Sequence, residues 1–319
     1  MAAAARYENY SDFGGTLTGR LAARVGVAPG VSLRGSAGTG FRAPSLAQIY
    51  FNSTFTDFVG GAAIDKVIAR NDGELAAALG IPALREEKSM QASVGVTARG
   101  GPFTATVDAY VVDIDDRIVL TGAFEDTDPD IGAELRALNV GAAQFFTNAL
   151  DTRTRGLDVV LAYARPFGAH GVRAAFVANF NDMELGDITT TPRLAGKEDI
   201  YFGAREQAFL LASAPDSKMS LSLDHTFRGM ESSLRVNRYG EVELIDWIDS
   251  ADVYEAAYTV DASVTYRIAP FASVTLGGTN LFDAYPSQQD TETETGGVWD
   301  AVQMGSSGAF YFLRLNIRR

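Results

Sequence analysis

The chain has 319 residues, of which 46% are hydrophobic and 21% charged, with a formal net charge of −13 and no cysteine. This apolar fraction excludes a disordered protein, and the missing cysteines exclude disulfides, thiolate zinc sites, iron–sulfur clusters and cysteine nucleophiles. The acidic balance argues against nucleic-acid binding, which needs clustered Lys and Arg. With His170 and His225 as its only histidines, the chain has little scope for imidazole catalysis or a multi-histidine metal site.

Targeting segments are not evident in the sequence. The first residues, 1–5, run directly into the polar stretch 6–12, without the basic and apolar regions of a signal peptide. No apolar run approaches the roughly 18 to 20 residues that a membrane-spanning helix needs. Average hydropathy alone would therefore class the chain with soluble proteins.

Alternation of apolar and polar residues changes that interpretation. From residue 16 to 27, for example, Leu17, Leu21 and Val25 fall on one face of a strand while Arg20 and Arg24 fall on the other. Many such segments approach the roughly 9 to 11 residues with which a tilted strand crosses a bilayer. We expect about eleven strands of this kind, at residues 16–27, 31–41, 90–99, 103–111, 157–163, 172–180, 219–227, 232–243, 253–268, 271–281 and 308–318.

The connections between these segments alternate in length. Short turns at 28–30, 100–102, 166–171, 228–231 and 269–270 alternate with long segments at 42–86, 122–144, 184–216, 242–252 and 282–307. Short turns at one end and long loops at the other are typical of outer-membrane barrels, in which the apolar face meets lipid and the polar face lines the lumen. Alternation alone also fits a soluble sandwich, but strand length, loop asymmetry and aromatic residues near strand ends favour a single-domain transmembrane antiparallel β-barrel.

A family resemblance rests on a series of short blocks. The blocks lie at residues 6–13 (RYENYSDF), 38–45 (GTGFRAPS), 46–51 (LAQIYF), 86–89 (EEKS), 108–116 (DAYVVDIDD), 154–158 (TRGLD) and 279–285 (TNLFDAY). In this order they resemble the TonB-dependent outer-membrane receptors, and together they cover nearly the whole chain. The combination of GFRAPS with a much later TNLFDAY is more specific than any single block.

The resemblance implies an up-and-down barrel of about 22 strands with a plugged lumen, in the outer membrane of a Gram-negative bacterium. Such a receptor imports a scarce ligand, of the iron chelate, cobalamin or carbohydrate class, with energy passed on by TonB. Residues 1–319 would then form the C-terminal half of the barrel, without the N-terminal plug through which TonB acts. Arg319 stands where the family usually ends on an aromatic residue. We therefore expect a fragment that does not transport by itself.

Three motifs that could carry other chemistry are set aside. The segment 38–43 matches G-x-G-x-x-A, but Pro44 follows at once and no long helix can bring its N-terminus to a dinucleotide. The acidic segment 126–130 begins like a calcium loop, yet Ala137 stands where the bidentate glutamate belongs. Neither histidine lies near an evident nucleophile. We expect no enzyme activity, no cofactor and no metal site.

Aromatic residues in the long loops are the candidate ligand contacts. They are Phe51, Phe55, Phe58, Trp247 and Trp299, which can stack on a ring of a sugar, chelate or cofactor or can simply pack the loops together. The same loops hold many carboxylates, which would favour neutral or cationic ligands at the mouth. Expected partners are outer-membrane lipid and a small-molecule ligand, with no nucleic acid. The alternative functions are a passive porin-like channel and a soluble all-β enzyme or binding module.

Overall fold

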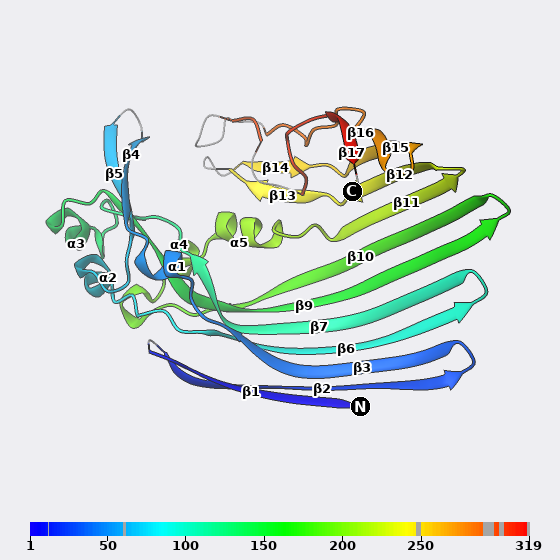
Figure 1. Cartoon of the computed structure of the whole chain (residues 1–319). Helices are drawn as coiled ribbons and strands as arrows, with labels where there is room; N and C mark the ends of the chain where they lie inside the picture. The colour runs from blue at the N-terminus through cyan, green and yellow to red at the C-terminus, as the bar shows by residue number, and fades with distance from the viewer. Residues whose placement is uncertain (12, 60–61, 247–249, 290–296, 300–302, 318–319) are drawn as a thin grey trace.

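The computed structural model describes all residues except 12, 60–61, 247–249, 290–296, 300–302 and 318–319, and it describes the backbone alone at 57–59 and 62–64. Arg319 therefore lies outside the described residues. One broad antiparallel sheet dominates the structure (Figure 1). Its main path runs through β1 (Ala2–Tyr10), β2 (Gly14–Ala28), β3 (Val31–Arg42), β6 (Glu87–Gly100), β7 (Phe103–Leu120), β9 (Ala142–Phe167), β10 (His170–Ile188), β11 (Ser217–Phe227), β12 (Met230–Tyr239), β15 (Ala257–Ala269), β16 (Ala272–Thr279) and β17 (Phe310–Ile317).

Every segment expected to form a strand contributes to this structure, with two differences. The segments 232–243 and 253–268 are each divided, because β13 (Val242–Ile245) and β14 (Ala251–Tyr254) leave the main path and pair as a separate ribbon. The strand β1 is additional and pairs with β2 from Ala2↔Ala22 to Tyr10↔Gly14. Its alanine run has no alternating pattern by which the sequence could show it. The main path thus has twelve strands.

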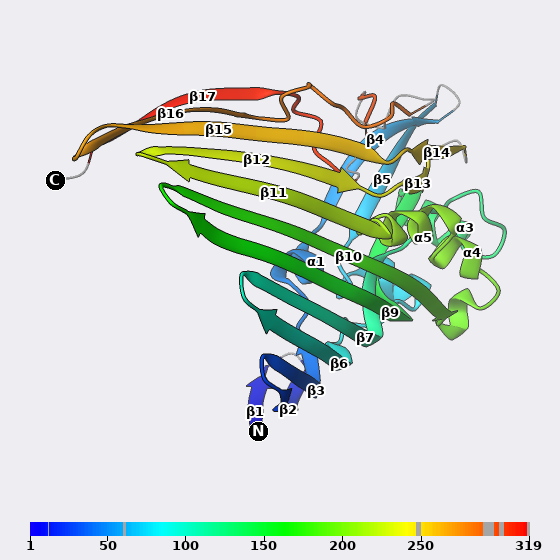
Figure 2. The same cartoon turned by 90° about the vertical axis from the view of Figure 1, so that its right-hand side faces the viewer.

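The sheet is strongly curved, with a concave and a convex face (Figure 2). It is not closed, because β1 and β17 stand at its two ends and do not pair with each other in the described part of the chain. The apolar row is exposed along the strands: Leu17 is 70% exposed and Leu313 is 74% exposed. A soluble sandwich would cover this face with a second layer, whereas a barrel wall turns it to lipid. Among the described residues, no helix is both long and apolar enough to span a membrane.

The two ends of the sheet differ as the spacing of the strands predicts. Tight hairpins join β2 to β3, β6 to β7, β9 to β10, β11 to β12 and β15 to β16 at one end (Figure 1). The opposite end carries the long loops. They contain α1 (Leu46–Tyr50), β4 (Ser53–Val59), β5 (Ala62–Ala69), α2 (Glu74–Leu79), β8 (Phe124–Glu125), α3 (Gly132–Ala137), η1 (Pro192–Leu194), α4 (Glu198–Tyr201) and α5 (Ala204–Leu211).

The principal hydrophobic core lies in these loops and not in the sheet. Ribbon β4–β5 is antiparallel, and β5 continues in parallel along the loop end of β9. Around it, α2, α3 and α4 enclose buried side chains that include Leu79, Phe124, Phe145 and Leu194. Helix α2 ends at Gly80, whose φ of 69° is left-handed and suits glycine. We call this packed unit the loop cap.

Candidate functional site

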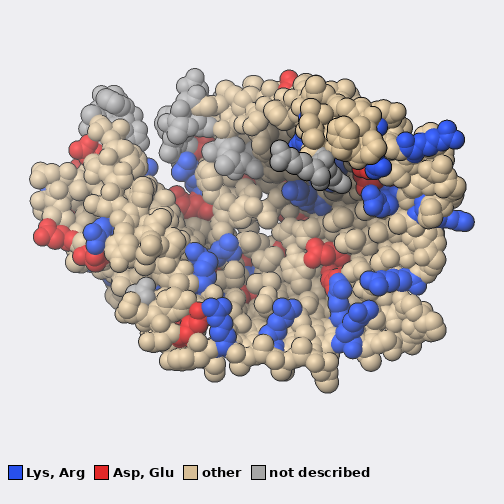
Figure 3. All heavy atoms as spheres, viewed as in Figure 1, with Lys and Arg blue, Asp and Glu red and all other residues tan. Residues whose placement is uncertain are grey.

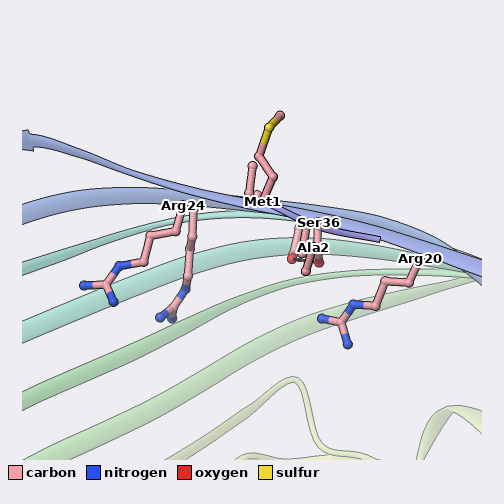
Figure 4. Close-up of a pocket in the computed structure, with 10 residues that line it drawn as sticks. Met1, Ala2, Arg20, Arg24 and Ser36 are labelled. Atoms are coloured by element: carbon pink, nitrogen blue, oxygen red, sulfur yellow. Dashed lines mark hydrogen bonds between the residues drawn. The ribbon is translucent and has the colours of Figure 1, made fainter. Parts of the chain in front are cut away.

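The polar row of β2 and β3 faces the concave side of the sheet. Arg20, Arg24 and Ser36 project together from the same side of the ribbon, while Met1 points to the other side (Figure 4). Arg34 also lines this shallow cavity, which has a volume of about 410 Å³. Arg24 and Arg34 are direct cross-strand partners. The wall therefore presents a group of guanidinium ions to the lumen.

Among the described residues, the carboxylates of Asp108 and Asp158 lie near this group. Arg34 forms a two-pronged ion pair with Asp108 on β7, in which its Nε donates to Oδ1 at 2.7 Å and its Nη2 donates to Oδ2. Arg24 donates from Nε to the Ser32 hydroxyl at 3.1 Å. Arg20 has no side-chain partner within the described residues. Like charges on directly opposed strand residues repel, so Asp108 relieves part of the repulsion and leaves a net positive surface.

The GFRAPS block organises the loop end of the same strands. Arg42 pairs with Glu87, its Nε donating to Oε2 at 2.6 Å, and the backbone N–H of Ile118 donates to Glu87 Oε1 at 2.8 Å. Ser45 caps α1 by accepting a hydrogen bond from the Gln48 N–H at 3.1 Å. The block thus ties β3 to β6, β7 and the first long loop. The two motif glycines, 38 and 40, lie within β3 and pair with β6, so they do not open a phosphate-binding helix.

The TNLFDAY block forms a fixed turn after β16. The side chain of Asn280 forms two hydrogen bonds with the backbone of Ala284. Its Nδ2 donates to the Ala284 carbonyl at 2.7 Å, and its Oδ1 accepts from the Ala284 N–H at 3.0 Å. Asp283 accepts a hydrogen bond from the Ala309 N–H at 2.7 Å. Both Asn280 and Asp283 have left-handed φ values, of 49° and 55°. This block therefore has a structural role, positioning the last loop against the start of β17.

The acidic segment 126–130 is part of the loop cap, and two of its carboxylates contact the same lysine. Lys197 donates to Asp128 at 2.7 Å and 2.9 Å and lies 2.9 Å from Asp130. Burial would raise the pKa of Asp128, but hydrogen bonds from Lys197 and from the N–H groups of Asp130 and Ile131 lower it below its ordinary value. The hydrogen bonds of Lys197 to the carboxylates of Asp128 and Asp130 raise the pKa of Lys197. In the described residues no cluster of three or more His, Asp or Glu side chains could hold a metal ion.

The predicted aromatic ligand contacts are placed separately. Phe51 is 45% exposed at the end of α1, and Phe55 on β4 is 41% exposed with Lys66 Nζ 6.0 Å above its ring. The backbone of Phe58 pairs with Ala63, and Trp247 lies outside the described residues. Trp299 is half-buried.

The environment of Trp299 is that of a packing residue. Its ring stacks on Tyr285 at 5.2 Å, and its Nε1 donates to the Pro286 carbonyl at 3.0 Å. Within the described part, no ring contact joins Phe51, Phe55 and Trp299. Their role in ligand binding stays a prediction. The concave arginines were visible in the sequence as part of the polar row, but alternation alone gave no sign that Arg24 and Arg34 would meet across two strands.

Comparison with known proteins gives one family and several structural relatives. Residues 2–281 match the family model described as TonB dependent receptor-like, beta-barrel. A search of curated proteins found no match. Similar solved structures include a mutant of the ferric enterobactin receptor from Pseudomonas aeruginosa, which is 15% identical with a TM-score of 0.64 over 98% of this chain and 41% of that one.

Two further structures give the same result. The siderophore receptor PirA from Acinetobacter baumannii is 14% identical, and the outer membrane transporter YddB from Escherichia coli is 12% identical. Each has a TM-score of 0.64, and each alignment covers 98% of this chain and 42% of the other. At such identities the likeness is one of fold. The chain spans less than half the length of these structures.

Proposed function

Because the chain belongs to the TonB-dependent receptor family of transporters in the Gram-negative outer membrane, we propose that it forms the C-terminal part of a barrel that takes up a scarce ligand with energy from TonB. The observation that carries the proposal is the exposed apolar face between tight hairpins and long, packed loops. TonB would act through a plug domain inside the barrel. Bond-making chemistry is not part of this function, since transporters of this family are not enzymes.

The concave arginines favour an anionic ligand inside the barrel, in contrast to the loop carboxylates, which were expected to favour neutral or cationic ligands at the mouth. Arg20, Arg24 and Arg34 face the lumen with Asp108 and Asp158 as nearby carboxylates, so the arginines outnumber them. Such a surface attracts carboxylate- or catecholate-bearing metal chelates and gives no advantage to a neutral sugar. The related structures named as receptors for ferric enterobactin and siderophores are consistent with this class. Of the three ligand classes in the family, we therefore favour an anionic iron chelate.

The first test concerns the membrane. Expressed in its native host, the protein should fractionate with outer membranes and migrate differently on gels before and after heating. Recovery as a soluble monomer without detergent would contradict the barrel. A passive channel is distinguished by reconstitution, since a porin conducts ions through lipid bilayers without TonB whereas a plugged receptor does not.

The second test concerns the ligand. Growth under iron restriction, with a ferric siderophore as the sole iron source, should depend on the protein and on TonB. Replacing Arg20 and Arg24 together with Gln should lower uptake of the anionic chelate, because the lumen loses two guanidinium groups. Unchanged uptake in this double variant would remove the anionic-ligand proposal and leave the membrane assignment intact.

A further inference from the structure

The two histidines of the chain lie in contact on the convex, lipid-facing side. Nδ1 of His170 on β10 is 2.9 Å from Nε2 of His225 on β11. His170 shares its face with Val172 and Phe176, and His225 shares its face with Leu223, so both rings belong to the apolar row. The sequence placed them far apart in the chain and gave no sign of this contact.

The geometry allows one hydrogen bond between the two rings. Their centroids are 5.2 Å apart and their planes differ by 19°, so with nitrogens 2.9 Å apart the rings meet edge to edge. One of the two facing nitrogens must therefore donate and the other accept. In a neutral pair of this kind, one outward N–H remains to donate to a group outside the protein. His170 is held further by a stack on Phe227, 4.3 Å between centroids.

Two arginines flank the histidine pair on the same rim. Arg165 shares the face of the apolar row on β9 and lies 5.1 Å from the Phe167 ring centre. Arg228, in the β11–β12 hairpin, lies 5.2 Å from the centre of Phe227. The four basic residues thus come from neighbouring strands β9, β10 and β11, which span about 10 Å. Guanidinium groups held over aromatic rings at a membrane boundary can reach headgroups while their stems remain in the apolar layer.

The acidic residues that border the β11–β12 hairpin in sequence, Asp224 and Glu231, belong to the concave face and not to the face of the histidine pair. Neither residues 163–173 nor residues 225–230 contain Asp or Glu, although the whole chain has a net charge of −13. Figure 3 shows mostly Lys and Arg toward the hairpin end of the molecule and more Asp and Glu toward the loop end. In barrels of this type short turns face the periplasm, where the adjoining leaflet presents phospholipid headgroups.

We propose that Arg165, His170, His225 and Arg228 form a binding site for the phosphate of an anionic phospholipid headgroup in the periplasmic leaflet. The site rests on the proposed membrane insertion and orientation. The arginines supply charge and paired N–H donors to the phosphate oxygens, and the histidine pair supplies an oriented N–H beside them. Phe167 and Phe227 pack against the glycerol and upper acyl region, as aromatic girdles do.

The test uses the protein extracted from outer membranes into a nonionic detergent. The temperature at which half of the folded band is lost on gels is measured with dioleoylphosphatidylglycerol or dioleoylphosphatidylcholine added to the micelles. Phosphatidylglycerol should raise this midpoint by several degrees more than phosphatidylcholine does. High salt should remove most of that difference, because screening weakens exposed charge pairs.

Variants locate the effect. R165Q/R228Q should lose most of the difference between the two lipids, and H170Q/H225Q a smaller part. The matched control, R173Q/R235Q, removes two arginines from the concave face of neighbouring strands and should keep the full difference. An equal response of the wild-type protein to both lipids, persistence of the difference in high salt, or its full retention in R165Q/R228Q would overturn the site. Fractionation with outer membranes, measured without added lipid, separates such a failure from failure of the barrel itself.

Discussion

The strand wall, which is the main path of the sheet from β1 to β17, exposes its apolar side chains, whereas the loop cap buries them. On the wall, Leu17 and Leu313 remain at least 70% exposed, whereas in the cap Leu79 and Phe145 are 0% exposed. The wall depends on lipid to cover its apolar face, because its backbone is satisfied within the sheet and no second layer of the described residues packs on that side. The cap buries its own core, as a small water-soluble domain does. One chain thus contains two folding environments, and substitutions in one should change its stability without changing that of the other.

The largest expected effect is in the cap. Phe145 lies at the loop end of β9, packed 6.4 Å from Phe124 between ring centres. Phe145→Ala should cost about 3–5 kcal/mol of cap stability, because it removes a buried ring and leaves a cavity. Hydrogen exchange in α2, α3 and α4 should accelerate while the hairpin end of β9 stays protected. Uniform loss of protection along β9 would show that cap and wall form a single cooperative unit.

The next effect belongs to the wall and depends on which face is changed. Leu161 lies in the exposed apolar row of β9, and the adjacent Ala162 lies on the other face. Leu161→Arg should cost about 2–4 kcal/mol, the range for an arginine facing lipid near the bilayer midplane. Ala162→Arg is the matched control and should cost much less, since its side chain enters the lumen. Denaturant titration of the protein in lipid vesicles measures both, and equal losses would contradict the assignment of faces.

An intermediate effect tests the charge pair of the cap. The lowered pKa of Asp128 means that its pairing with Lys197 stabilises the cap above the ordinary carboxyl pKa of 3.8 and is lost as the pH falls through the lower folded-state value. The raised pKa of Lys197 means that its contribution is lost only as the pH rises through a value above 10.5. Asp128→Asn should cost about 1.5–3 kcal/mol between these limits, because it weakens hydrogen bonds between two charged groups.

The pH dependence provides the control for that variant. Amide exchange in α3 and α4 should show acid destabilisation of the cap in the wild-type protein and a weaker one in Asp128→Asn. The wall strands should respond equally in both proteins. If the two proteins lose cap protection at the same pH and to the same extent, other carboxylates govern the acid response.

The sequence predicted the wall well and the cap poorly, for a physical reason. Each wall strand can be recognised from its sequence, because one face meets lipid and the other faces water. Apolar and polar residues therefore alternate with a period of two. The cap is built from short elements whose packing is non-local: β5 pairs in parallel with β9 across about 75 residues of chain. No local sequence pattern around Ile68 predicts that it pairs with Gln144. Nothing in the acidic segment 126–130 predicts that Asp128 contacts Lys197, which lies 69 residues away in the chain.

The candidate sites divide in the same way. The lumen-facing arginines follow from strand parity once the faces are known, as Arg20 and Arg24 show. Contacts between strands cannot be predicted from parity, because they depend on the register of neighbouring strands. The His170–His225 contact, for example, requires that His170 lie opposite Phe227 in the pairing of β10 with β11. Aspartate is a favoured N-cap residue, yet Gly73 is the N-cap of α2 and the preceding Asp72 pairs with Arg70. Side-chain partners, not propensity, decided these details.

The smallest expected effect tests a single hydrogen bond where the cap meets β9. The hydroxyl of Tyr201 in α4 lies 2.6 Å from Thr147 Oγ1, and both groups are buried. Burial raises the pKa of Tyr201, so its hydroxyl stays neutral and the bond does not change across the physiological range. Tyr201→Phe should cost about 1–2 kcal/mol, because Thr147 keeps a buried hydroxyl without its partner. Thr147→Val in the same background should restore part of that loss, since both polar groups are then gone. A double variant as unstable as the sum of the single ones would show that the two hydroxyls are not coupled, and that α4 is held to the wall by its apolar contacts alone.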